Sequence, residues 1–156
     1  MLRAGNRAGT SLRMLNNMIR SRSADSTREC SSTVDLLELD LMTGDCTFIK
    51  SGAAPSFIIR GGVVRRMQAG TVPIGIICAL DAKETSFSLL PGDTVVMVSD
   101  GVIESEGEGE WLVSFLSGAG ELTPDEIVYN ICLKAGAHDG HDDCSAIALR
   151  IEAADT

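Results

Sequence analysis

Alternating apolar and polar residues, interrupted by glycine-containing turns, fill the middle of the chain. Residues 34–50 alternate on either side of a turn at 43–45, which predicts a β-hairpin. Residues 56–67 repeat this pattern around Gly61-Gly62, where the positive φ of a tight turn costs glycine nothing. The first half of the chain is therefore predicted to build a sheet from hairpins.

Two further strands are predicted within residues 84–98, on either side of the turn at 91–93. The second of them, residues 95–98, is apolar at every position, which indicates a strand buried on both faces. Residues 145–151 form another apolar run and predict the last strand of the chain.

Helical spacing first occurs near the start of the chain. Residues 10–22 predict an amphipathic helix, with Thr10 or Ser11 as its N-cap. Its apolar side chains at helical spacing are Leu12, Leu15, Met18 and Ile19.

The strongest helix signals lie in residues 123–136. Thr123 is suited to the N-cap, Pro124 to the first helical position, and Gly136 to the residue after the end. A shorter helix is predicted at 111–115. Together the elements give a helix, about six antiparallel strands, a helix and one last strand. This order predicts an α+β fold in a single domain spanning residues 1–156, and it excludes a parallel dinucleotide-binding sheet.

Charge and cysteine content narrow the class of protein. The formal net charge of -9 argues against nucleic acid as a partner, because phosphate binding needs a basic surface. The five cysteines form no paired motif, so neither a zinc site nor a disulfide framework is expected, and they are predicted to be buried in a reducing cytoplasm. No apolar run is long enough to span a membrane.

Acidic residues at two predicted strand ends are the candidates for chemistry. Asp100, in the stretch SDG, follows the buried strand, and Asp142 and Asp143 precede the last strand. Carboxylates fixed at strand ends are ligands that Mg²⁺ or Mn²⁺ prefers. The residues alone leave other interpretations open, because Asp-Gly often forms a turn and an acidic pair can cap a turn or lie in a solvated loop.

Other candidate sites are weaker. His138 and His141 lie three positions apart, but no cysteine or third histidine accompanies them, so they are interpreted as loop residues. Ser51 and Ser56 flank a segment that could present N–H groups to an anion, although a tight connection between strands explains it equally well. Asp93 is treated as a surface residue, and Glu104 likewise.

The order of these motifs resembles the PPM-type (protein phosphatase 2C-like) phosphatases, and most of all the phosphatase domain of the stage II sporulation protein E family. The similarity covers residues 2–152 and rests on four stretches in sequence order: TVDLLELDLMTGDCTFIKSGAAPSFIIRGG, VPIGI, LLPGDTVVMVSDGV and DGHDDCSAIALRI. It implies a layered α-β-β-α sandwich of antiparallel sheets and hydrolysis of phosphoserine or phosphothreonine with two Mn²⁺ or Mg²⁺ ions.

The resemblance also assigns roles to particular residues. It implies that Asp100 and Asp142 are catalytic metal ligands, that Asp143 supports them, and that Gly101 allows the backbone close to the metals. The substrate it implies is a phosphorylated anti-sigma factor antagonist during sporulation. The parent protein would carry a membrane-spanning region before a cytoplasmic domain.

One family motif is missing from these residues. An Asp-Gly on an early strand, whose aspartate bridges both metals, is expected upstream of Leu2. We therefore expect a C-terminal portion of the domain, weak or inactive alone, with uncovered sheet edges that allow self-association. The alternative is a non-catalytic regulatory or protein-binding module of the same fold. A purely structural hairpin domain would leave the order of motifs unexplained.

Overall fold

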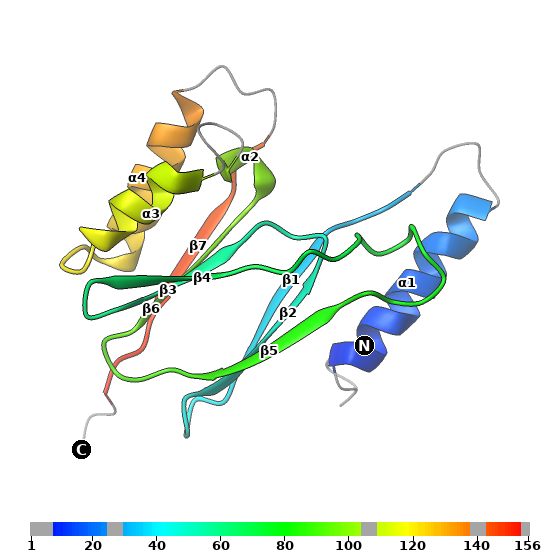
Figure 1. Ribbon diagram of the computed structural model, residues 1–156, viewed down its shortest axis with the longest axis horizontal. Coiled ribbons are helices and arrows are strands. Elements are labelled where there is room, and N and C mark those ends of the chain that lie inside the picture. Colours follow the sequence, from blue (N-terminus) through cyan, green and yellow to red (C-terminus); the bar gives the residue numbers. More distant parts are fainter. Residues whose placement is uncertain (1–7, 25–29, 104–108, 138–142, 154–156) are drawn as a thin grey trace. The chain divides into compact units, whose positions relative to one another are not determined.

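The computed structural model describes residues 8–24, 30–103, 109–137 and 143–153. It divides into two compact units (Figure 1). The first unit contains the described residues up to Asp40, with Cys46–Ala53 and Ala69–Phe87. The second contains Leu41–Asp45, Ala54–Gln68 and the described residues from Ser88 onward.

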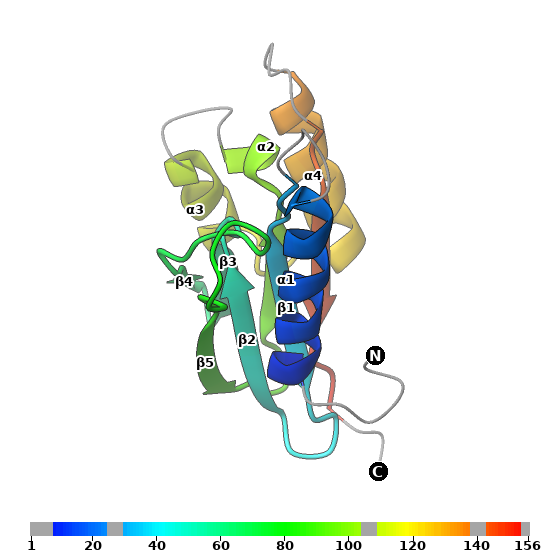
Figure 2. The ribbon, with the colours of Figure 1, turned by 90° about the vertical axis from the view of Figure 1, so that its right-hand side faces the viewer.

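The first unit is a three-stranded sheet with one helix. The sheet has the order β1-β2-β5, and its elements are β1 (Val34–Leu39), β2 (Asp45–Ser51) and β5 (Lys83–Ser88). Strands β1 and β2 are antiparallel, as the alternating pattern of residues 34–50 predicts, and Val34 pairs with Ser51. Helix α1 (Ala8–Ala24) runs beside this sheet (Figure 2).

Helix α1 is where the sequence predicts it, but only part of the predicted apolar face is buried. Ala8 and Leu12 pack against Ile49 of β2. In contrast, Leu15 and Met18 are 37% and 54% exposed, so the predicted apolar face is wrong at these two positions. Thr10 and Ser11 lie inside the helix, and neither is its cap.

Asn16 completes the buried face of α1 through its amide group. The side chain is 2% exposed and donates from Nδ2 to the carbonyls of Ile77 and Cys78, at 3.2 and 3.3 Å. Its Oδ1 accepts from the N–H of Gly75 at 2.8 Å. A polar residue is thus accommodated in the interface because backbone groups satisfy it.

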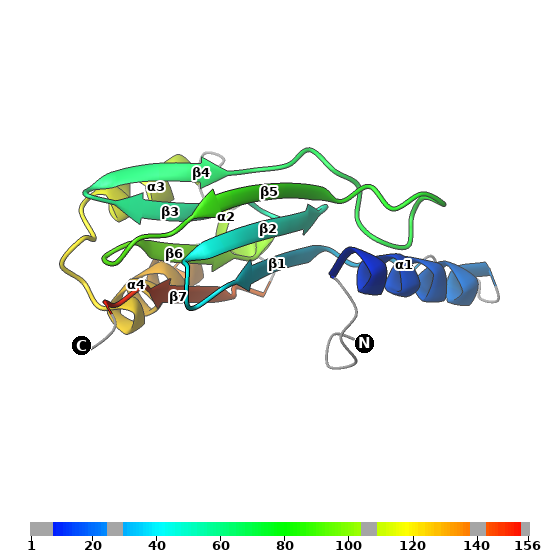
Figure 3. The same cartoon turned by 90° about the horizontal axis from the view of Figure 1, so that it is seen from below.

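The second unit is a four-stranded antiparallel sheet. Its order is β4-β3-β6-β7 (Figure 3), with β3 (Ser56–Arg60), β4 (Val63–Met67), β6 (Thr94–Val98) and β7 (Ala146–Arg150). The β3–β4 turn has φ values of 55° and 78° at Gly61 and Gly62, which confirms the predicted glycine turn. The predicted double burial of β6 is also confirmed, since only Met97 in that strand is partly exposed.

Three helices belong to the second unit: α2 (Asp100–Ile103), α3 (Glu110–Ser117) and α4 (Pro124–Gly136). Helices α3 and α4 cover one face of the sheet (Figure 1). Fully buried residues from the sheet and helices share one core there: Phe57, Val96, Val102, Leu112, Leu116, Ile127 and Ile131.

Helix α4 begins with the predicted cap in the form of a capping box. Thr123 Oγ1 accepts from the N–H of Glu126 at 3.3 Å, while Glu126 Oε2 accepts from the N–H of Thr123 at 2.8 Å. This N–H, together with the Thr123 hydroxyl, lowers the pKa of Glu126. Gly136 is the last residue of the helix and Ala137 is the C-cap, one position later than expected.

Strands β5 and β6 follow one another in the chain but belong to different sheets. The turn at 91–93 therefore connects two sheets, where the sequence suggests only two neighbouring strands. None of the five cysteines, which all lie in the described residues, forms a disulfide, and Cys30 and Cys78 are exposed, so the expectation that all are buried is wrong. None of the helices described is long and apolar enough to cross a membrane.

Candidate functional site

Strand β6 delivers Asp100 to one end of the four-stranded sheet. The buried strand ends at Val98, and the chain turns at Ser99 into α2. The N–H of Val102 donates to the carbonyl of Ser99 at 3.2 Å, and Val102 itself is fully buried, which anchors this turn. Asp100 is exposed, and its Oδ1 accepts from the N–H of Gly101 at 3.2 Å. A buried strand and a buried anchor thus present an exposed carboxylate.

The entrance to β7 lies directly beside this turn. Ser99 donates its N–H to the carbonyl of Ser145 at 2.9 Å, and the N–H of Ser145 donates back to Ser99 Oγ at 2.9 Å. Ser99 Oγ in turn donates to the carbonyl of Asp143 at 3.2 Å. The two acidic segments, separated by about forty positions in the chain, therefore meet at one end of the sheet (Figure 1).

The structure thus brings together Asp100, Gly101 and Asp143, three of the four residues predicted for the metal site. Asp142, the fourth, lies outside the described residues, as do His138, His141 and Glu104. Asp100 and Asp143 are both exposed, and carboxylate oxygens are hard donors that suit Mg²⁺ or Mn²⁺. Within the described ranges, no group of three or more His, Cys, Asp or Glu residues could by itself hold a metal ion.

Sequence reasoning missed Ser99, the residue that joins the two segments. Its only signal in the sequence is its place between a buried strand and Asp-Gly. That signal does not reveal which distant backbone groups the hydroxyl contacts.

Asp93 is not a surface residue, which corrects the expectation from the sequence. Its side chain is 2% exposed and accepts from Arg60 Nε at 2.8 Å and from Arg60 Nη2 at 2.5 Å. The N–H of Leu90 donates to it at 2.7 Å. Burial raises the pKa of Asp93, but the bonds from Arg60 and Leu90 outweigh burial and leave the pKa below its ordinary value. Asp93 is a structural anion at the start of β6.

The segment around Ser51 forms a tight connection. Ser51 is fully buried and its hydroxyl donates to the carbonyl of Val72 at 2.7 Å. The N–H of Gly52 donates to Thr71 Oγ1 at 3.0 Å. These bonds favour the structural interpretation of this segment over an anion cradle.

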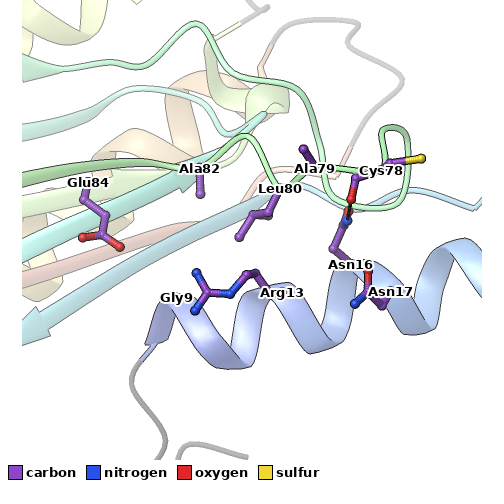
Figure 4. Close-up of a pocket in the computed structure, with 9 residues that line it drawn as sticks. All are labelled: Gly9, Arg13, Asn16, Asn17, Cys78, Ala79, Leu80, Ala82 and Glu84. Carbon is purple, nitrogen blue, oxygen red and sulfur yellow. Dashed lines mark hydrogen bonds between the residues drawn. The ribbon is translucent and has the colours of Figure 1, made fainter.

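The first unit also contains features that the sequence did not suggest. Lys50 is 3% exposed and forms an ion pair with Asp35 at 2.6 Å, where burial outweighs the carboxylate and lowers the pKa of Lys50. A cavity of about 430 Å³ lies between α1 and the segment leading into β5 (Figure 4). Arg13 and Glu84 are its charged lining residues, and no metal-ligand cluster lies among the described residues there.

Comparison with solved structures identifies the class of protein. The PP2C phosphatase domain of the Bacillus subtilis cell fate determinant SpoIIE matches with a TM-score of 0.78 and 30% identity, over 96% of this chain and 46% of that one. The manganese-presoaked form of that phosphatase domain matches with a TM-score of 0.72 and 30% identity, over 99% of this chain and 71% of that one. The fold is therefore that of the PP2C-type (PPM) phosphatase domains, which confirms the predicted α+β class.

The sequence comparisons identify the family. The model described as stage II sporulation protein E (SpoIIE) matches residues 1–152, and the chain belongs to this family. Stage II sporulation protein E of Bacillus subtilis (strain 168) is 32% identical over 148 residues, which is 90% of this chain. The chain spans only 18% of the length of that relative.

Proposed function

We propose that the chain is part of a metal-dependent protein-serine/threonine phosphatase of the SpoIIE type. The observation that carries this proposal is the meeting of Asp100 and the Asp143 segment at one end of the four-stranded sheet, held together through Ser99. In a chain of the SpoIIE family, this proximity of Asp100 and Asp143 supports a metal site formed by the two acidic stretches.

The chain's own residues would act as follows. Asp100 and Asp142 would hold Mn²⁺ or Mg²⁺ as ligands, with Asp143 in a supporting role and Gly101 allowing the backbone close approach. When bound, the metals would supply a nucleophile from water and would neutralise charge on the phosphoryl oxygens. The exposed position of Asp100 at a strand end leaves room for a phosphorylated residue of another protein, while Val102 fixes the backbone that carries it.

We further propose that the substrate is a phosphorylated anti-sigma factor antagonist in sporulation control. The relative's name supports a role in sporulation. The reaction would take place in the cytoplasm, with two metal ions in the intact domain. The 156 residues alone are expected to be weak or inactive, because the family resemblance implies a further metal-ligating aspartate, in an Asp-Gly motif that these residues do not contain.

The experiment uses the protein at the full length that its gene encodes. Release of inorganic phosphate from a phosphoserine protein is measured with Mn²⁺ and with EDTA. Asp100→Asn and Asp142→Asn should each lower kcat/KM by about 100-fold or more, because metals contribute several kcal/mol to transition-state stabilisation. Asp125→Asn, which neutralises an exposed aspartate in the first turn of α4, is the matched control and should retain wild-type activity.

The same assay separates the proposal from the non-catalytic alternative. A regulatory module of PPM fold would bind the phosphoprotein without releasing phosphate, and Mn²⁺ would not change the result. Equal turnover by wild type and both aspartate variants would show that the metal assignment is wrong.

A further inference from the structure

Ser99 lies where strand β6 becomes helix α2, and the two elements compete for its carbonyl. The β6–β7 ladder runs from Thr94 paired with Arg150 to Val98 paired with Ala146. Ser99 continues the ladder with its N–H, which donates to the carbonyl of Ser145 at 2.9 Å. In an antiparallel pair, the returning bond would run from the N–H of Ser145 to the carbonyl of Ser99.

That carbonyl has turned toward the helix and accepts from the N–H of Val102 at 3.2 Å. The hydroxyl of Ser99 takes its place, since the N–H of Ser145 donates to Oγ at 2.9 Å. One side-chain oxygen thus lets the chain leave the sheet for α2 while the ladder with β7 keeps its last bond.

The O–H of Ser99 can also donate a hydrogen bond, because a hydroxyl can accept and donate at the same time. It donates to the carbonyl of Asp143 at 3.2 Å and so holds the backbone of that residue. Asp100 is the residue directly after Ser99. One hydroxyl therefore couples the backbone positions of both acidic segments.

We propose that Ser99 is a positioning residue for the metal site, because its hydroxyl holds the backbone of Asp143 beside the turn that carries Asp100. This inference rests on the proposed function. Groups that orient metal ligands without touching the metal typically contribute 10-fold to 100-fold to metal affinity. Alanine at this position would keep the backbone bond from Ser99 to Ser145, but it would leave the N–H of Ser145 and the carbonyl of Asp143 without the hydroxyl.

The test measures Mn²⁺ affinity by isothermal titration calorimetry in the full-length protein, together with thermal unfolding of the metal-free form. Ser99→Ala should weaken Mn²⁺ binding by roughly 10-fold or more. Ser99→Thr keeps a hydroxyl at the same position and should restore affinity to within a few-fold of wild type. Thr123→Ala removes the cap of α4 and is the control for stability: it should lower the unfolding temperature and leave Mn²⁺ affinity unchanged.

The outcomes separate this inference from the proposed function. If Mn²⁺ binding is present and is lost in Asp100→Asn, but Ser99→Ala binds as wild type does, the positioning role is wrong and the phosphatase proposal stands. The positioning role is equally wrong if Thr123→Ala weakens Mn²⁺ binding as much as Ser99→Ala does, because the effect would then follow stability. If wild type and Asp100→Asn bind Mn²⁺ alike, the metal site itself is wrong and both proposals fail.

Discussion

Replacing Arg60 by methionine would leave the buried carboxylate of Asp93 without its cation. Asp93 is 2% exposed, while the side chain of Arg60 is 43% exposed, so the two partners differ in how well water can replace the lost contact. Removing one partner of a buried ion pair costs about 3–5 kcal/mol. Because the guanidinium is partly solvated, we expect a smaller loss of about 2 to 3 kcal/mol for Arg60→Met.

Asp93→Asn should cost less, about 1 kcal/mol, because the amide keeps an acceptor for the N–H of Leu90 and the exposed guanidinium is rehydrated. The assay is urea unfolding followed by the fluorescence of Trp111, the only tryptophan of the chain, which lies in α3 of the same unit. The double variant Arg60→Met/Asp93→Asn should have a free energy of unfolding close to that of Asp93→Asn alone, because it contains no buried charge without a partner.

The stability of the wild type and that of Arg60→Met should change with pH in opposite directions. In the wild type the pKa of Asp93 is lowered, so its contribution to stability is present above the unfolded pKa of about 3.9 and is lost as pH falls through the lower folded pKa. In Arg60→Met the bonds from Arg60 no longer oppose the effect of burial, which raises the pKa of Asp93, so this variant should recover stability as pH falls from 7 toward the unfolded pKa of about 3.9. A difference in stability between wild type and Arg60→Met that does not change with pH, or equal losses for Arg60→Met and Asp93→Asn, would show that Arg60 does not neutralise the buried Asp93.

Three further substitutions, one of them with a matched control, test local contacts within the units by thermal or urea unfolding. Gly75→Ala should destabilise by more than about 2 kcal/mol, because φ is 97° and a Cβ would lie 2.5 Å from Ile19 Cγ2, whereas Gly70→Ala, with open space around it, should be nearly neutral. Asn16→Ala should cost about 2 kcal/mol, because it removes the amide that satisfies three backbone groups; a loss below about 0.5 kcal/mol would contradict this role. Thr123→Ala should cost about 1 kcal/mol through loss of the α4 cap, and unchanged stability would show that the capping box contributes nothing.

Local structure was largely predictable from the sequence because its causes are local. Gly61-Gly62 has the positive φ values that a two-residue hairpin turn needs. Thr123, Pro124 and Glu126 together define a helix start that few other structures would use. The apolar run of β6 also reveals its burial, because a strand between two others and under helices has no polar face.

Features that depend on distant partners were not predictable in the same way. Leu15 and Met18 have helical spacing, but the side of α1 that meets the sheet is set by Ile49 and by the backbone that satisfies Asn16. Asp93 looks like a turn residue until Arg60, thirty-three positions away, is brought beside it. A pattern within one element cannot show such contacts.

In the candidate site, too, the residues could be predicted from the sequence, but the contacts between them could not. Asp100 and Asp143 could be found in the sequence because carboxylates at strand ends carry a chemical signal. Their meeting at one end of a sheet depends on the pairing of β6 with β7, which joins segments far apart in the chain. The hydrogen bond from Ser99 Oγ to the carbonyl of Asp143 is a consequence of that pairing, and no pattern in the sequence predicts it.

Metal-dependent phosphatase activity that uses Asp100 is tested by comparing phosphate release from a phosphoserine protein by the full-length wild type and Asp100→Asn, each with Mn²⁺ and with EDTA. We expect efficient turnover only for the wild type with Mn²⁺, and a loss of about 100-fold or more in the variant and with the chelator. Equal turnover by both proteins, or turnover that persists in EDTA, would contradict a metal-dependent phosphatase that uses Asp100.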